Sequence, residues 1–146
     1  MAATISYENG HKYEGEIHDN NIRHGYGIMK MSNGDTYKGE YLNDKRNGYG
    51  KYVYRGAEDG EEEFYDGHFV NNKRDGFGVY TYITKTTYTG WWRENLKEGS
   101  GVLVYPDGIV IKGTFYNGTI KFGEIQFPSG GTCYHSHTFS IFLKDI

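Results

Sequence analysis

The sequence predicts an all-β protein, an elongated single-layer antiparallel sheet made of consecutive β-hairpins and twisted along its length. A pattern of Tyr-x-Gly followed by Gly-aromatic-Gly recurs along the chain, for example in residues 37–52, which read YKGEYLNDKRNGYGKY. Within each copy the side chains alternate with a period of two, which is typical of strands that have one polar face. No segment shows a capped apolar period of 3.6 residues, so we expect helices to be marginal at most.

The repeat occupies nearly the whole chain, and its copies start roughly every 23 to 28 residues. The copies start at Tyr13, Tyr37, Tyr65 and Tyr88, a weaker copy starts at Ile111, and a stub starts at Tyr134. The longest interval contains the acidic insertion EDGEEE at residues 58–63. We therefore predict a single domain over residues 1–146, with partial repeats near 1–12, around Tyr7, and near 132–146.

Each copy is expected to form two short strands. Tyr37, Gly39 and Tyr41 alternate with polar residues in the first strand, and the second carries Gly-aromatic-Gly followed by Tyr52 and Tyr54 on one face. Polar segments such as NDKRN and NNKRD fit the connections within hairpins. The glycines leave room on the aromatic face, and we predict that a ring from an adjacent strand lies over each of them.

The connections between repeats carry turn signals of their own. Asn33-Gly34 and Asp107-Gly108 are strong hairpin signals because Asn, Asp and Gly tolerate positive φ at both central positions. Hairpins joined in this way give one continuous sheet in which every repeat depends on its neighbours.

Composition limits the class of protein. The 22 glycines and 17% aromatic residues, against 36% hydrophobic residues overall, require rings to supply most of the apolar area and argue against disorder. The formal charge of −3 is too small to indicate nucleic acid binding. Cys133 is the single cysteine, which excludes an internal disulfide. The N-terminal residues show no signal peptide and no apolar run reaches the roughly 20 residues of a spanning helix, so we expect a cytoplasmic protein.

This repeat resembles the MORN repeat (membrane occupation and recognition nexus), and the resemblance extends from about Tyr7 to Phe139. It implies an elongated, groove-like antiparallel sheet. It also implies a scaffold, an adaptor or a membrane-proximal tether, associated with the cytoskeleton or a membrane. The C-terminal copies depart from the pattern at Ser100, Ile111, Lys121 and Ser136. Drifted copies of this kind are typical of capping repeats.

An enzyme is not expected. Gly25-Tyr26-Gly27 lacks the third glycine of a dinucleotide fingerprint and the helix that would receive the phosphate. No nucleophile elbow or Walker loop is present. The repeats leave no second domain for an active site, so we predict no catalytic residues and no organic cofactor.

One cluster of residues has metal-ligating chemistry. Cys133, His135 and His137 project from one face of a strand, where a thiolate and two imidazoles could bind zinc. A structural zinc site needs a fourth ligand, which would have to come from elsewhere, for instance from a second molecule. The other interpretation is an exposed polar face on a capping strand, opposite Tyr134.

Cations recur in the loops just before each Gly-aromatic-Gly unit, and we call them the basic ridge. The basic ridge consists of Arg23, Lys45, Arg46, Lys73, Arg74 and Lys97. Equivalent positions in an array line up, so these cations could bind anionic phospholipid or an acidic partner. Interspersed carboxylates favour the alternative that the charges keep the protein soluble and keep sheet edges from pairing.

The aromatic face is the preferred binding surface, because Tyr and Trp give large contact area for few rotatable bonds. The candidate groove residues are Tyr41, Tyr52, Tyr54, Phe69, Tyr80, Tyr82, Tyr88 and Trp92, some of which we expect to be accessible. The leading hypothesis is a non-enzymatic protein-interaction scaffold that binds a partner helix or extended segment. A homodimer through the C-terminal repeats, with an edge strand near 139–143, would be compatible with it. A phospholipid-binding module is the alternative, and a targeting fragment of an enzyme is a second rival.

Overall fold

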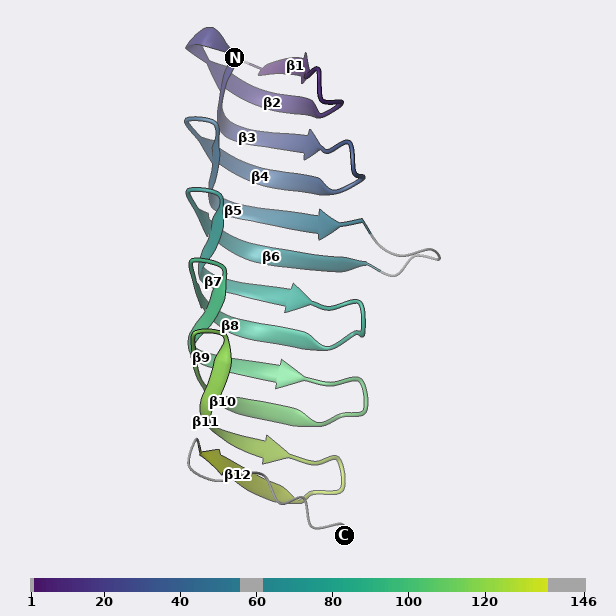
Figure 1. Ribbon diagram of the computed structural model, residues 1–146, viewed down its shortest axis with the longest axis vertical. Helices are drawn as coiled ribbons and strands as arrows, with labels where there is room; N and C mark the ends of the chain where they lie inside the picture. Colours follow the sequence, from purple (N-terminus) through teal and green to yellow (C-terminus); the bar gives the residue numbers. More distant parts are fainter. Residues whose placement is uncertain (1, 56–61, 137–146) are drawn as a thin grey trace.

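The computed structural model describes residues 2–55 and 62–136 of the chain. In this part, twelve strands follow one another along the long axis of the molecule (Figure 1). They are β1 (Ala2–Ser6), β2 (Lys12–His18), β3 (Ile22–Lys30), β4 (Thr36–Leu42), β5 (Lys45–Tyr54), β6 (Glu63–Val70), β7 (Lys73–Thr81), β8 (Thr87–Arg93), β9 (Leu96–Val104), β10 (Val110–Tyr116), β11 (Thr119–Gln126) and β12 (Thr132–Ser136). A short 3₁₀ segment, Asp19–Asn21, joins β2 to β3.

The strands form one open antiparallel sheet in the order β1 to β12, each strand paired with the strands next to it in the sequence (Figure 1). The prediction of an all-β sheet of consecutive hairpins is confirmed. In the described part of the chain no helix is long and apolar enough to cross a membrane. The acidic insertion lies largely outside the described residues, as do His137 and the expected edge strand near 139–143.

The turns within repeats are tighter than the sequence suggested. Asn43 and Asp44 have φ of 48° and 66°, and Asn71 and Asn72 have φ of 47° and 71°. Two consecutive residues at positive φ form the two-residue turn that matches the twist of the flanking strands. Lys45 therefore begins β5, and the cations that we expected in loops belong to strands.

The turns between repeats follow another geometry. The Met31 N–H donates to the Asp35 carbonyl and the Gly34 N–H donates to the Met31 carbonyl, at 2.9 and 3.0 Å. Positive φ occurs at Gly34 (94°) but not at Asn33, and likewise at Gly108 but not at Asp107. The hairpins predicted at Asn33-Gly34 and Asp107-Gly108 are confirmed. They form through a loop longer than two residues, in which the glycine has positive φ and the residue before it does not.

A β-bulge interrupts each repeat between its two glycine units. Gly39 pairs with Gly50 while Tyr41 pairs with Arg46, so the second strand holds extra residues at this point. Gly48 has φ of 99° there. The Glu40 carboxylate accepts the Tyr49 N–H at 2.9 Å. A bulge bends its strand and increases the local twist. The first glycine of each Gly-aromatic-Gly unit is therefore required for backbone conformation and not to accommodate a ring.

The second glycine of each Gly-aromatic-Gly unit does accommodate a ring. A Cβ on Gly50 would lie 2.5 Å from Cζ of Tyr37, and one on Gly39 would lie 2.6 Å from the Tyr37 hydroxyl oxygen. Neither position tolerates a side chain at such distances. The prediction of a ring from an adjacent strand is confirmed at Gly50, which lies on β5 under Tyr37 of β4. At Gly39 it is wrong, because the ring over this glycine is Tyr37 of the same strand.

The core is a single row of rings along the sheet. Its fully buried members, the opening tyrosines, alternate with a second set of rings in edge-to-face contacts whose centroids are 5.0–5.4 Å apart. The row runs Tyr13, Tyr41, Tyr37, Phe69, Tyr65, Trp92, Tyr88, Phe115. Each opening tyrosine also donates its hydroxyl to a carbonyl at the bulge, as Tyr37 does to Glu40 at 3.0 Å. Edge-to-face contacts of this kind add roughly 0.5–1.5 kcal/mol beyond area burial.

The C-terminal part departs from this plan. Ile111 stands where the other repeats have tyrosine, and the Ile120 side chain covers Gly113 and Gly123 instead. The bulge is also shorter, because Gly113 pairs with Gly123 while Phe115 pairs with Ile120. Lys121 stands where the other repeats have the first glycine of the Gly-aromatic-Gly unit, and with the shorter bulge its φ is not positive.

The last strand is offset by one residue from the expected register. Cys133 pairs with the buried Ile125, so Cys133 and not Tyr134 stands at the position of an opening tyrosine. Tyr134 lies on the other face and is 81% exposed. The expectation that a stub repeat opens at Tyr134 is therefore wrong, since a shift of one residue moves every side chain to the opposite face.

Candidate partner-binding face

We call the face of the sheet that carries the row of rings the ring face. Five of the eight predicted groove residues, Tyr41, Phe69, Tyr80, Tyr88 and Trp92, are buried on it. They belong to the core and offer little surface to a partner, which corrects the expectation for them. Tyr52, Tyr54 and Tyr82 are half-buried and pack on the core from outside. The tyrosines that remain accessible are thus those nearest the turns between repeats.

These accessible rings form a continuous patch with Tyr80. The centroids of Tyr52 and Tyr54 are 4.6 Å apart, those of Tyr54 and Tyr80 are 5.9 Å apart, and those of Tyr80 and Tyr82 are 4.5 Å apart. We call the half-buried rings Tyr52, Tyr54 and Tyr82 the tyrosine strip. Tyr105, at the equivalent place of the next repeat, is 36% exposed and continues it. The strip runs across repeats, roughly perpendicular to the strands.

Carboxylates fix the orientation of two of these rings. The Tyr52 hydroxyl donates to Asp35 Oδ2 at 2.7 Å, and the Tyr80 hydroxyl donates to Glu63 Oε1. Burial and the bond to Asp35 raise the pKa of Tyr52. Burial alone would raise the pKa of Asp35, but the bonds that it accepts from Arg55, Tyr52 and Asn33 hold that pKa below its usual value. The ring of Tyr52 is therefore preorganised before any partner arrives.

Four members of the basic ridge line up on the ring face and not on an outer edge. We call this set the cation column, and it consists of Arg23, Arg46, Arg74 and Lys97. Each cation lies over aromatic rings: the Arg46 Cζ is 5.1 Å from the Tyr52 centroid, and the Arg74 Cζ is 4.5 Å from the Trp92 centroid. Such contacts are worth roughly 0.5–2 kcal/mol. The expectation of a ridge of free cations is thereby corrected.

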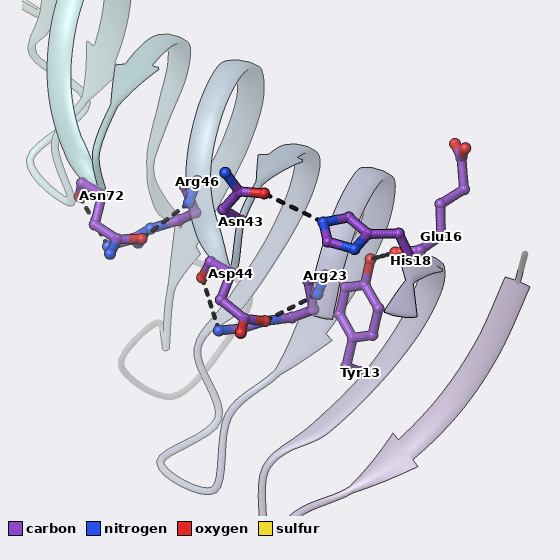
Figure 2. A network of polar contacts seen from close by, with 8 residues as sticks. All are labelled: Tyr13, Glu16, His18, Arg23, Asn43, Asp44, Arg46 and Asn72. Atoms are coloured by element: carbon purple, nitrogen blue, oxygen red, sulfur yellow. Dashed lines mark hydrogen bonds and ion pairs between the residues drawn. The ribbon is translucent and has the colours of Figure 1, made fainter. Parts of the chain in front are cut away.

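The arginines also join each hairpin to the next. The Arg23 N–H and Nε both donate to Asp44 Oδ1, at 2.9 and 3.0 Å, and Nη2 donates to the Asp44 carbonyl at 2.8 Å (Figure 2). The Arg46 backbone N–H donates to Asn72 Oδ1 and Arg46 Nη2 donates to the Asn72 carbonyl, both at 2.9 Å (Figure 2). Burial alone would raise the pKa of Asp44, but its bonds with Arg23 outweigh burial and lower it.

The other two ridge residues are surface cations. Lys45 is exposed, and Lys73 forms an exposed ion pair with Glu94 at 3.1 Å. Exposed pairs of this kind contribute roughly 0–1 kcal/mol. Within the described residues, Lys45 and Lys73 are the two members of the basic ridge that do not lie over aromatic rings.

Sequence reasoning missed the rings on the opposite face of the sheet. Tyr49, Phe77 and Trp91 are about half exposed, and the rings of Phe77 and Trp91 meet at 5.7 Å between centroids. Tyr49 contacts His68 on the neighbouring strand at 4.5 Å. Tyr49 and Phe77 are the central aromatics of Gly-aromatic-Gly, and the period of two by itself assigns them to the face opposite the glycines.

The proposed zinc ligands are only partly placed. Cys133 is half-buried on the ring face, and the backbone of His135 pairs with Gly123. His137 lies outside the described residues. Within residues 2–55 and 62–136, no three His, Cys, Asp or Glu side chains gather as metal ligands would. The zinc site through Cys133, His135 and His137 stays a prediction.

The sequence pattern that defines the MORN repeat matches residues 13–36, 37–56, 65–87 and 88–110. These ranges agree with the repeating hairpins of the sheet. The chain belongs to the MORN-repeat family. The four matches start at the tyrosines from which the sequence predicted four copies, so that resemblance is confirmed.

The chain is similar to a small part of some much longer proteins. Alsin from Mus musculus and alsin from Homo sapiens are each 34% identical to this chain over 116 residues, which cover 76% of this chain and 5% of alsin. Among solved structures, the Drosophila melanogaster SAS-4 (dCPAP) TCP domain, in complex with a proline rich motif of Ana2 (dSTIL), is 17% identical with a TM-score of 0.36. That match covers 92% of this chain and 84% of the other. A similarity this slight assigns neither a function nor a partner to this MORN array.

Proposed function

We propose that this MORN array is a non-enzymatic interaction scaffold that binds a helix or an extended segment of a partner protein along the tyrosine strip. The observation that carries the proposal is the single-layer sheet: no second layer covers Tyr52, Tyr54 and Tyr82 within the described residues. Contiguous accessible aromatic surface on a protein of this kind usually marks an interaction site.

The strip suits a segment that runs along the array. Its rings come from two successive repeats, with Tyr52 and Tyr54 on β5 and Tyr82 just after β7, so a bound helix or strand would contact both repeats at once. Tyr52 is already held by Asp35, which lowers the ordering cost of binding. Tyrosine supplies rigid contact area with two side-chain torsions, which also favours affinity.

The alternative of a phospholipid-binding module has less support from the geometry. Three arginines of the basic ridge are occupied by rings and by turn carbonyls. A free Lys or Arg near an anionic membrane is worth about 1 kcal/mol, so the three lysines Lys45, Lys73 and Lys97 would give weak binding. Anionic vesicles therefore serve as the contrasting partner in the test.

The test compares two faces of the same array. The double variant Tyr54→Ala/Tyr82→Ala removes accessible rings of the strip, and Tyr49→Ala removes a ring of similar size from the opposite face. Partners captured from the native cell by the wild type and identified by mass spectrometry should be lost with the double variant and retained with Tyr49→Ala. Retention by both variants, combined with salt-sensitive sedimentation on anionic vesicles, would overturn the scaffold and support the module.

Self-association through the C-terminal repeats is a further part of the proposal. In the described sheet β12 is the terminal strand and pairs with β11, and the terminal strand of a sheet is the one that can pair with a second chain. Sedimentation equilibrium over a range of concentrations checks it, because a dimer predicts a mass that doubles as concentration rises.

A further inference from the structure

The last member of the cation column lacks the partner that the other three have. Arg23, Arg46 and Arg74 each donate their backbone N–H to the side-chain oxygen of an Asp or Asn in the next hairpin turn, at 2.9 Å. At Lys97 the equivalent turn residue is Gly118, whose N–H donates to the Lys97 carbonyl at 3.0 Å just as the other turn residues do. The turn is therefore in the same place, but glycine provides no side-chain acceptor.

The Lys97 ammonium has no hydrogen-bond or ion-pair partner in the described part of the chain. It lies over the rings of Tyr82, Tyr88 and Phe115, 5.2, 5.0 and 5.9 Å from their centroids. Rings contact the cation but accept no strong hydrogen bond, so its donors remain available. Lys97 thus combines an available ammonium with a backbone N–H that no Asp or Asn side chain occupies.

A cavity lies where the missing side chain would be. Its volume is about 220 Å³, and its lining includes Lys97, Gly118, Arg74 and Tyr82. A Cβ on Gly118 would meet only Leu96 Cδ2, at an ordinary 3.7 Å. The space is therefore open to a polar group from outside, and Arg74 adds a second positive charge to its wall.

We propose that this cavity binds the carboxylate of an acidic side chain carried by the partner segment. The first repeat shows the arrangement within the same molecule: Asp44 Oδ1 accepts the Arg23 N–H and the Arg23 Nε together. A carboxylate at Lys97 would accept the backbone N–H and the ammonium in that manner. Charge-assisted bonds of this kind are about twice as strong as neutral ones. The inference rests on the proposed function, since Tyr82 belongs both to the cavity and to the tyrosine strip.

The direct experiment titrates the protein with a capped aspartate, N-acetyl-aspartate methylamide, and follows backbone amides in nitrogen–proton correlation spectra. We expect a saturable shift of the Lys97 amide and no shift of the Arg23 amide, which Asp44 already occupies. Inorganic phosphate is titrated in parallel. Saturable binding of phosphate without binding of the capped aspartate, or no saturable shift at Lys97 with either, would overturn the carboxylate site.

Two variants sharpen the test. Gly118→Asp supplies an internal carboxylate, and the positive φ of 81° is tolerable for Asp, which has 66° at Asp44. We expect a higher melting temperature and loss of the Lys97 shift. Lys97→Met keeps the aliphatic stem and removes the charge, and binding should weaken about tenfold. An unchanged response of Gly118→Asp to the capped aspartate would contradict the proposal.

Failure of this site and failure of the scaffold give different results. Tyr54→Ala leaves the cavity intact, so its Lys97 titration should match the wild type even where partner capture is lost. Conversely, full partner capture by Lys97→Met would reject the carboxylate site while leaving the tyrosine strip in place.

Discussion

The second repeat and the fifth repeat solve the same packing problem with different residues. In the second repeat the Tyr37 ring fills the space over Gly39 and Gly50, and its hydroxyl reaches the bulge carbonyl of Glu40. In the fifth repeat Ile120 fills that space from the partner strand, without a hydroxyl and with a shorter bulge. The difference shows that the paired glycines need an apolar group over them, whereas the bulge needs the tyrosine hydroxyl only when it is long.

The largest expected contrast comes from removing the covering group. Tyr37→Ala should lower the free energy of unfolding by about 4 kcal/mol, because a fully buried ring and its hydrogen bond are lost. Ile120→Ala removes the half-buried covering group of the fifth repeat and should cost about 2 kcal/mol or less. Urea denaturation followed by circular dichroism measures both. Equal losses would mean that the two repeats do not differ in this way.

Adding a methyl group to the glycine under the covering side chain tests the same difference between the second and the fifth repeat. Gly50→Ala forces a Cβ into the Tyr37 ring and should cost about 3 kcal/mol. Gly123→Ala meets the Ile120 Cδ1, the movable end of a flexible side chain, at 2.6 Å, and should cost about 1 kcal/mol. The midpoints of urea denaturation decide between them. A Gly123→Ala variant as unstable as Gly50→Ala would show that the isoleucine is held as rigidly as the tyrosine.

Removing only the hydroxyl isolates its contribution. Tyr37→Phe should cost about 1 kcal/mol at neutral pH. Burial raises the pKa of Tyr37 above the value of about 10 in the unfolded chain. The stability that depends on the neutral hydroxyl is therefore complete below pH about 10 and is lost as the pH rises above it. The wild type should lose more stability than Tyr37→Phe on that rise, as measured by denaturation at each pH, and parallel losses would refute the assignment.

The smallest effect concerns the first link between hairpins. The pKa of Asp44 is lowered by its bonds with Arg23, so its contribution is present above pH about 4 and is lost as the pH falls below that value. Asp44→Asn reproduces the residue found at the equivalent Asn72 and should change stability by less than about 1 kcal/mol at neutral pH. Acid titration of unfolding should show a smaller loss for the variant than for the wild type. A steeper loss in the variant would reject the link.

The sheet and the placing of its rings on one face could be predicted from the sequence, because the period of two and the recurring glycines are visible in a single chain. The bulge could not be predicted in the same way. Gly48 and Gly50 look equivalent in the pattern, yet the extra residues between Arg46 and Gly50 assign one to backbone conformation and the other to packing.

The candidate site was harder to predict for a related reason. The sequence shows Arg46 and Arg74 only as positive charges that could bind an anionic surface. The planar guanidinium also stacks on rings and binds turn carbonyls. Burial of Trp92 and Phe69 depends on contacts between successive repeats, which alternation within one strand does not report. The offset at Tyr134 likewise depends on the register of β11 with β12.

The bonds from each arginine to the next hairpin turn set the order in which the repeats complete their contacts during synthesis. Arg23 finds its oxygens on Asp44, which lies 21 residues later in the chain, and Arg46 finds its own on Asn72. While the chain is being synthesised, a hairpin that has left the ribosome cannot close its polar contacts until the following turn has emerged. Folding from the N-terminus would thus proceed one hairpin behind synthesis.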